Sequence, residues 1–243
     1  MAARVRIGTS GWEYRHWAGD FYPRDLPRDR WFDHYAAHFD TVELNNPFYR
    51  LPEAAVFEGW CRRAPSGFTY AVKASRYLTH MKRLREPEEP IERFWTRASR
   101  LDEHLGPVLY QLPPRWKPNL DRLRAFMRLV PRHDQAIEFR DRRWYTPETA
   151  AIVADAGFSL CLHDMAGSAP PTEPIGPFVY VRFHGAGERY GGRYSGQRLR
   201  GWADRIAAWA SEGRPVWAYF NNDTGGHAIR DAERLREMVA RRT

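Results

Sequence analysis

The sequence predicts an α/β fold, a TIM-like (β/α)8 barrel with parallel strands inside and helices outside. Eight short runs typical of buried strands recur along the 243 residues. Most of these runs are separated by segments whose apolar residues follow helical spacing. Alternating strands and helices favour a parallel sheet covered by helices, and the length suits one barrel of eight such units. We therefore expect residues 1–243 to form a single domain, with an open doubly wound sheet as the alternative.

The expected strands are short runs of apolar and β-branched residues bounded by turn residues. The clearest is residues 41–46, where Val42 and Leu44 alternate with polar residues. Successive side chains of a strand point to opposite faces, so Glu43 lies on a polar face. Pro47 then ends the run because proline lacks the amide donor. In chain order, the expected strands are residues 5–10, 41–46, 68–75, 107–112, 135–140, 158–164, 179–184 and 216–222.

Most segments between these strands carry apolar side chains three and four positions apart, as an amphipathic helix does. Within residues 90–105, for example, Ile91, Phe94 and Trp95 follow this spacing. Pro147 stands at a favoured first helical position. In chain order, the expected helices are residues 27–38, 53–63, 90–105, 119–130, 147–156, 197–212 and 226–241.

The segment after the sixth strand is the exception to this rhythm. Residues 165–177 include Pro170, Pro171, Pro174 and Pro177. Proline lacks an amide donor and clashes with the preceding helical turn, so these residues oppose a regular helix. We expect the sixth helix to be short or replaced by a proline-rich loop.

Composition and charge limit the class of protein and its partners. The chain has 38 basic and 30 acidic residues, a net charge of +8. This excess favours an anionic small molecule or nucleic acid as partner, although an arginine-rich surface without that function is the alternative. The apolar runs are too short to span a membrane and no signal peptide is evident, so we expect a cytoplasmic protein. The oligomeric state is not predicted.

Polar residues recur on the second face of the expected strands, near their C-terminal ends. If the more apolar face packs on the helices, the polar face points inward, and active sites of barrels lie at that end. Carboxylates there suit general bases or metal ligands, cations stabilise developing negative charge, and histidines carry protons. The alternative is a buried salt-bridge network without a catalytic role. The candidate catalytic residues are Glu43, Lys73, Glu138, Arg140, His163, Arg182 and His184.

Two glycine-rich loops and an aromatic loop favour a bound ligand. Residues 185–196 and 221–227 each lead into an expected helix, whose N-terminus attracts anions, and Arg189 and Arg193 suit phosphate. Alternatively, these loops only turn the chain and cap helices. Aromatic side chains at 12, 16, 17, 48 and 49 form either a stacking rim or a packed lid. The candidate substrate-binding residues are Trp12, Asn45, Tyr49, Gln111, Arg193, Tyr219, Asn221 and Asn222.

A bound divalent metal is possible, and any other cofactor is unknown. The sequence offers suitable ligand types, but none of them follows a known motif spacing, and a lone histidine is more often a hydrogen-bonded core residue. The two cysteines likewise show no metal or redox spacing. The candidate ligands are Glu43, Glu138, His163, Asp164 and His184.

Several longer motifs resemble one known family. They are Gly-Thr-Ser-Gly-Trp at 8–12, Thr-Val-Glu-Leu-Asn-Asn-Pro-Phe-Tyr-Arg-Leu-Pro at 41–52, Phe-Thr-Tyr-Ala-Val-Lys-Ala-Ser at 68–75, Gln-Leu-Pro-Pro at 111–114, Ala-Ile-Glu-Phe-Arg at 136–140, Tyr-Val-Arg-Phe-His-Gly at 180–185 and Tyr-Phe-Asn-Asn at 219–222. The chain is thereby similar to the YecE-like family, domain of unknown function 72. The resemblance implies a TIM-like barrel and no settled activity. Its motif positions here are Trp12, Glu43, Asn45, Tyr49, Lys73, Gln111, Glu138, Arg140, Arg182, His184, Asn221 and Asn222.

Three functions are compatible with these observations. The first is an enzyme that hydrolyses a phosphate-containing substrate, including nucleic acid, at the polar end of the barrel. The second is a carbohydrate-active enzyme, either a glycoside hydrolase or a sugar isomerase. Direct ion pairs between the two carboxylates and Lys73 or Arg140 would weaken this hypothesis. The third is a non-enzymatic nucleic-acid-binding protein, whose affinity would fall steeply with salt.

Overall fold

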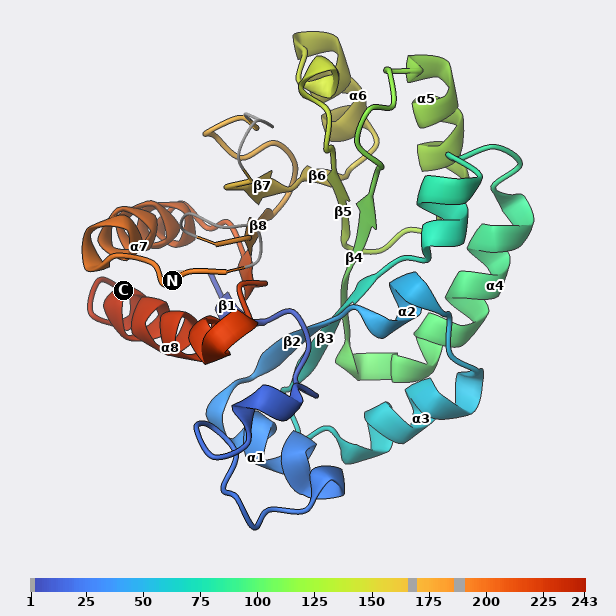
Figure 1. Cartoon of the computed structure of the whole chain (residues 1–243). Coiled ribbons are helices and arrows are strands. Elements are labelled where there is room, and N and C mark those ends of the chain that lie inside the picture. The colour runs from blue at the N-terminus through green and yellow to red at the C-terminus, as the bar shows by residue number, and fades with distance from the viewer. Residues whose placement is uncertain (1–2, 166–169, 186–190) are drawn as a thin grey trace. The chain divides into compact units, whose positions relative to one another are not determined.

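The computed structural model describes residues 3–165, 170–185 and 191–243. Strands and helices alternate along the chain (Figure 1). The strand pairs with a described register are all parallel. The predicted α/β class is therefore confirmed. The chain forms two compact units, Met1–Glu43 with His163–Met165 and Phe178–Thr243 as unit 1, and Leu44–Leu162 with Ala166–Pro177 as unit 2.

Unit 1 is built around three long parallel strands. β9 (Val216–Phe220) pairs with β1 (Val5–Thr9) and with β8 (Val179–Phe183), so that Val216 is in register with both Val5 and Val179. Phe183 stacks on Phe220 in this core, with ring centroids 4.3 Å apart. α7 (Gly196–Ser211) and α8 (His227–Ala240) pack side by side beside these strands (Figure 1). The shorter elements are η1 (Arg15–Trp17), η2 (Arg28–Arg30), α1 (Trp31–His38) and η6 (Thr224–Gly226).

Unit 2 has the same strand–helix alternation. β4 (Leu105–Gln111) pairs with β3 (Thr69–Lys73) and with β5 (Gln135–Glu138), and β5 pairs with β6 (Ser159–Leu160). Apolar side chains of these strands, such as Val72, Leu109 and Ile137, are fully buried. The helical elements are α2 (Asn46–Tyr49), α3 (Ala54–Arg63), η3 (Tyr77–Met81), α4 (Glu88–Ala98), η4 (Ser99–His104), α5 (Leu120–Leu129), η5 (Arg142–Trp144) and α6 (Pro147–Asp155).

Two short strands complete the sheets. β2 (Thr41–Leu44) and β7 (Leu162–His163) each cross from one unit to the other along the chain. The hydrogen-bonded order is β1-β9-β8-β7 in one sheet and β2-β3-β4-β5-β6 in the other. Neighbouring strands therefore mostly follow one another in sequence, as the predicted fold requires.

Several helices begin where the sequence indicates. Thr146 caps α6 by accepting a hydrogen bond from the amide of Thr149 at 3.2 Å, and Pro147 occupies the first turn. Asn119 accepts from the amide of Arg122 at the start of α5. Such caps satisfy amide groups that have no partner within the helix.

The expected sixth strand, residues 158–164, differs from the prediction because it is interrupted at Cys161. β6 ends at Leu160, whose amide donates to the carbonyl of Ile175 at 2.9 Å, and β7 starts at Leu162. The segment that contains Ile175 is the proline-rich one. Its described residues, 165 and 170–177, contain no helix, which confirms the expected loop for that part. Residues 166–169 lie outside the described residues.

The second strand also ends earlier than predicted. β2 stops at Leu44, and Asn46 already begins the short helix α2. Pro47 suits the first turn of a helix, where its missing amide costs nothing. In the described ranges, no helix is both long and apolar enough to cross a membrane.

Candidate functional site

Unit 1 holds Glu43 in a fully buried ion pair. Nη2 of Arg182 donates to Oε1 of Glu43 at 2.8 Å, and Nε of Arg182 donates to Oε2 at 2.9 Å. The hydroxyls of Tyr180 and Ser10 donate to the two oxygens, Tyr180 at 2.8 Å. We call Ser10, Glu43, Tyr180 and Arg182 the Glu43 cluster. All four residues are at most 1 % exposed.

The Glu43 carboxylate is already bonded at both oxygens by three side chains. A carboxylate offers about four lone-pair sites, and the described donors occupy them. A substrate group that gives its proton to Glu43 would first have to displace one of these donors. Burial and the Glu43 charge also raise the pKa of Tyr180, so its hydroxyl remains a donor at neutral pH. The geometry therefore favours a positioning role for Glu43, as in the salt-bridge alternative, and its catalytic role stays a prediction.

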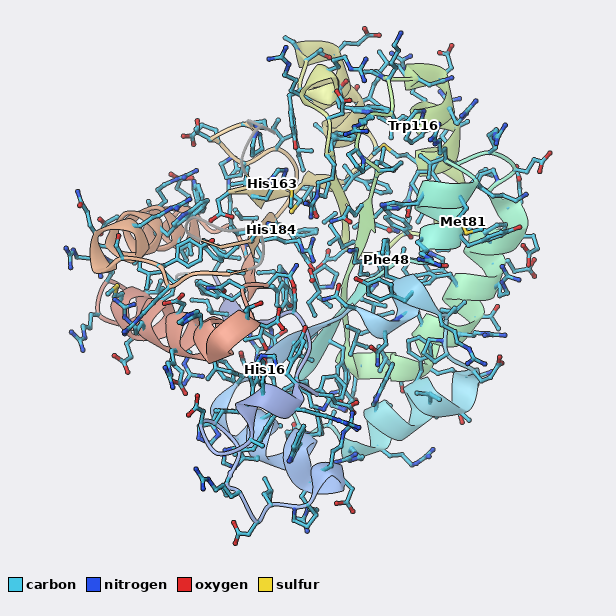
Figure 2. All side chains as sticks on the ribbon, in the orientation of Figure 1. His16, Phe48, Met81, Trp116, His163 and His184 are labelled. Carbon is cyan, nitrogen blue, oxygen red and sulfur yellow. The ribbon has the colours of Figure 1, made fainter. Side chains whose placement is uncertain are left out.

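The two predicted histidines lie together at the ends of β7 and β8. The rings of His163 and His184 are perpendicular, with centroids 5.8 Å apart (Figure 2). Nη1 of Arg182 lies 3.4 Å from Nε2 of His184, so this nitrogen is the acceptor. Nδ1 of His163 accepts from the amide of Met165 at 3.3 Å. These two contacts orient the rings, each through one ring nitrogen that accepts a hydrogen bond.

Asp164 connects these histidines to the glycine-rich loop after β8. Its Oδ1 accepts from the amide of His184 at 2.8 Å, and its Oδ2 accepts from the hydroxyl of Tyr194. Burial first, and then the nearby Asp164 charge, raise the pKa of Tyr194. The Tyr194 hydroxyl also accepts from the amide of Gly185 at 2.9 Å. Tyr194 therefore fastens both ends of this loop, of which residues 186–190, including Arg189, lie outside the described residues.

Asn222 is fully buried and its side chain bonds to other parts of unit 1. Its Nδ2 donates to Oδ2 of Asp231 and to the carbonyl of Gly192, each at 3.0 Å. Asp231 is fully buried and also accepts from the amide of Tyr194. Asn222 therefore anchors the same loop to α8.

In unit 2, the other predicted carboxylate is also ion-paired. Glu138 at the end of β5 is fully buried and its Oε1 contacts Nε of Arg140. Gln111 at the end of β4 donates from Nε2 to Oε2 of Glu138 at 2.9 Å. Both carboxylates of the proposed glycosidase pair are thus in direct ion pairs, Glu138 with Arg140 and Glu43 with Arg182 rather than with Lys73. The criterion given above is therefore met for Glu138 only, and the glycoside hydrolase alternative stays a prediction.

Lys73 and His80 both contact the Phe48 ring. The Lys73 ammonium is 3.8 Å from the centroid of Phe48, and the His80 ring meets Phe48 edge-on at 5.0 Å. Phe48 comes from α2, which the Asn-Asn-Pro-Phe-Tyr motif starts directly after β2 (Figure 2). We call Phe48, Lys73, His80, Gln111, Glu138 and Arg140 the His80 cluster.

A short hydrogen-bonded chain fixes the His80 tautomer. Thr79 donates its hydroxyl to the carbonyl of Ser75 at 3.2 Å, so its oxygen accepts from Nδ1 of His80 at 2.9 Å. Nδ1 is therefore protonated and Nε2 carries the lone pair. No hydrogen bond from a described residue engages Nε2. His80 thus presents an acceptor nitrogen.

The surroundings keep His80 neutral. Burial first, and then the charges of Lys73 and Arg140, lower its pKa from 6.5 to about 4, while Glu138 acts in the opposite direction. Two cations face one carboxylate in this cluster, so its field is positive. A positive field beside a neutral imidazole suits an anionic ligand that brings a proton to be removed.

The remaining predicted residues fall into two groups. Trp12 is 5 % exposed and packs edge-on against Phe32, and Tyr219 is fully buried with its hydroxyl 2.8 Å from that of Thr41. Trp17 is buried as well, which favours the packed lid over the stacking rim. The accessible members are Tyr49, which is 66 % exposed, Arg193, which is exposed, and Asn45 and Asn221, which are half-buried.

The predicted metal ligands are not gathered into one site in the part of the chain that the structure describes. Within it, no three side chains of His, Cys, Asp or Glu form a group that could hold a metal ion. Glu43 and Glu138 instead bond to arginines, and Asp164 bonds to Tyr194 and to the backbone.

His80 is the candidate that the sequence analysis missed. It lies in η3, a single π-helical turn, which repeats no helical or strand period. The available signal was weaker: a histidine seven residues after Lys73, in the loop at the C-terminal end of an expected strand. π-helical turns are rare in proteins overall, and those that occur are often found at functional sites.

Comparison with known proteins agrees with the fold and leaves the activity open. Residues 6–243 match the family model described as "Protein of unknown function DUF72". The UPF0759 protein YunF of Bacillus subtilis is 27 % identical over 273 residues, covering 97 % of this chain and 94 % of that protein. These relatives carry no described activity in their names.

Solved structures extend the likeness to three dimensions. A DUF72 family protein of Thermotoga maritima, solved by crystallography, is 27 % identical with a TM-score of 0.87, over 98 % of this chain and 99 % of that one. The D-psicose 3-epimerase of Clostridium cellulolyticum, a TIM barrel, matches with a TM-score of 0.55 at 12 % identity, over 97 % and 98 % of the two chains. The second likeness concerns the fold alone. Together they support the predicted TIM-like fold class.

Proposed function

The chain belongs to the DUF72 family, and from the geometry of the His80 cluster we propose that it is an enzyme that hydrolyses a phosphate-containing substrate. One observation supports this most strongly. His80 is neutral, its acceptor nitrogen Nε2 is fixed by Thr79, and Lys73 and Arg140 make its surroundings positive. This combination pairs a general base with charge stabilisation for an anion.

The proposed reaction proceeds in two proton-balanced events. A water molecule gives a proton to Nε2 of His80 while its oxygen forms a bond to phosphorus. The bond between phosphorus and the leaving oxygen breaks, and the leaving oxygen takes the proton from the imidazolium. Lys73 and Arg140 stabilise the negative charge on the phosphoryl oxygens, which is the main protein contribution to such reactions.

The lowered pKa of His80 fits this role once substrate is bound. Without an anion, the neighbouring cations disfavour the protonated ring. A phosphate group neutralises part of that field, so it raises the pKa of His80 toward neutrality. The imidazole therefore becomes a stronger base only when the substrate is in place.

The backbone near His80 provides additional support. Arg83, Leu84 and Glu86, directly after η3, adopt positive φ angles of 49°, 59° and 41°. Residues other than glycine rarely adopt this region, and such strain collects at functional sites. In unit 1, the roles of His163, Arg182 and His184 stay predictions for the same activity.

The test compares three chromogenic substrates. The purified protein is assayed with p-nitrophenyl phosphate, bis(p-nitrophenyl) phosphate and p-nitrophenyl glucoside by release of nitrophenolate. We expect turnover of a phosphoester, reduced by about 10²- to 10⁴-fold in His80→Gln, the range for loss of a general base. Arg140→Gln should lose activity as well. Hydrolysis of the glucoside instead would support the carbohydrate alternative.

A matched control separates the site from general loss of charge. Arg143 lies three residues after Arg140, is exposed, and bonds to Asp141 with Nη2 2.6 Å from Oδ2. Arg143→Gln should keep wild-type activity, and circular dichroism should show that all variants are folded. Phosphoester turnover that survives in folded His80→Gln contradicts the proposal. So does salt-dependent oligonucleotide binding without any hydrolysis.

A further inference from the structure

A concave surface lies in unit 2, at the opposite end of β5 from Glu138. It is a groove of about 700 Å³, a size typical of sites for small molecules. α5 forms one side, α6 and the turn after it form the other, and Gln135, the first residue of β5, lies at its base. Neither the predicted site residues nor the His80 cluster contributes to it.

The groove is strongly basic. Arg124, Arg128 and Arg132 follow one another at intervals of four residues and all line it, whereas Asp155 is its one acidic lining residue among those described. Arg124 bonds to Glu148 at 2.9 Å. Arg128 and Arg132 are exposed and make no hydrogen bond or ion pair with any described residue. Two guanidinium groups are therefore free to bind an anion.

The floor of the groove is apolar. Met127, Val130, Ile152 and Phe158 line it, and each is at most 8 % exposed. A purely ionic ligand would leave this surface uncovered. The lining therefore suits a molecule that joins an anionic group to an apolar or aromatic body.

Gln135 adds a specific polar requirement. It is 2 % exposed, and its Nε2 donates to the carbonyl of Pro131, which fixes the orientation of the amide. Its Oε1 is buried and has no hydrogen-bond partner among the described residues. Buried acceptors nearly always receive a hydrogen bond, so we expect a donor to bind this oxygen. A ligand N–H or O–H that enters the groove beside Gln135 would supply it.

We propose that this groove binds a small phosphorylated molecule that carries an aromatic ring and a hydrogen-bond donor. Arg128 and Arg132 would hold the phosphate, because two guanidinium groups match a dianion and bind phosphate oxygens bidentately. The apolar floor would contact the ring, and Oε1 of Gln135 would accept from the donor. The site is distinct from the one proposed for catalysis, so either can fail without the other.

The test is calorimetric titration of the whole chain with AMP, adenosine and inorganic phosphate. AMP should bind more tightly than either fragment. The double variant Arg128→Gln/Arg132→Gln should weaken AMP binding at least about tenfold, a loss of about 1.4 kcal/mol. Gln135→Met should weaken AMP binding but not that of inorganic phosphate. Repeating the titrations in Lys73→Met/Arg140→Gln removes the contribution of both cations of the His80 cluster.

A control pair, Arg100→Gln/Arg143→Gln, removes two arginines elsewhere in unit 2 and should leave AMP binding unchanged. The proposal is overturned if none of the three probes binds, or if AMP binds equally well to Arg128→Gln/Arg132→Gln. It is also overturned if the groove variants abolish only the binding of a single-stranded oligonucleotide or an acidic peptide. That result would assign the groove to a macromolecular partner.

Discussion

The neutral state of His80 makes the stability of the fold depend on pH in a defined direction. The pKa of His80 is lowered to about 4 in the folded chain, chiefly by burial and then by Lys73 and Arg140, against 6.5 when unfolded. Between these values the unfolded chain binds more protons than the folded one. The free energy of unfolding must therefore decrease as the pH falls through this window.

The size of the effect follows from the same two values. At about pH 5, these two pKa values correspond to a decrease of about 2 kcal/mol in the free energy of unfolding relative to neutral pH. Because the ring is only partly buried, water screens the charges, and we reduce the expected loss to about 1 kcal/mol. The stability that comes from keeping His80 neutral is fully present above the pKa of the unfolded chain. It is lost as the pH falls toward the pKa of the folded chain.

The assay is urea unfolding at a series of pH values between about 5 and 7.5, on wild type and His80→Gln. The difference between the two curves isolates His80 from the other histidines. The difference in unfolding free energy between the two proteins should change by about 1 kcal/mol across the series. The reason is that only the wild type binds a proton at position 80 on unfolding. Leu129→Gln, a change at an exposed position in α5 that alters no titrating group, is the control and should stay parallel to wild type. Parallel curves for wild type and His80→Gln would refute the reasoning.

Two further predictions concern unit 1. Arg182→Met should reduce the free energy of unfolding by about 3–5 kcal/mol, because it leaves the buried Glu43 charge without its cation. Adding Glu43→Gln should recover part of this loss in urea unfolding, whereas a single-variant loss below about 1 kcal/mol would contradict the ion-pair description. Gly8→Ala should cost about 1–3 kcal/mol in the same assay, since its Cβ would lie 2.3 Å from the carbonyl oxygen of Thr41. An unchanged unfolding midpoint in Gly8→Ala would show that β1 moves freely at this position.

The strands and helices were largely predictable because their signals are local. The spacing of Ile91 and Phe94 predicted α4, and Pro147 marked the start of α6. The proline-rich segment after the sixth strand was also predicted correctly in its described part. The interruption at Cys161 was not, because it falls where the chain passes from the sheet that contains β6 to the sheet that contains β7, and no local pattern marks that change.

The candidate site was predictable in its residue types but not in its pairing. The alternation in residues 41–46 indicated that Glu43 occupies a polar strand face. Its partner Arg182 lies 139 positions away, and no local pattern identifies it. His80 was missed because a single π-helical turn has no repeat, and the burial of Trp12 depends on packing against Phe32.

The most direct test of the central claim is the pKa of His80, measured from the NMR signal of its imidazole C2 proton. The account predicts a pKa of about 4 in the free protein. This pKa should rise when inorganic phosphate is added, and it should also be higher in Lys73→Met. Both changes reduce the positive field that keeps the ring neutral. An ordinary pKa of about 6.5 that responds neither to phosphate nor to Lys73→Met would contradict the anion site.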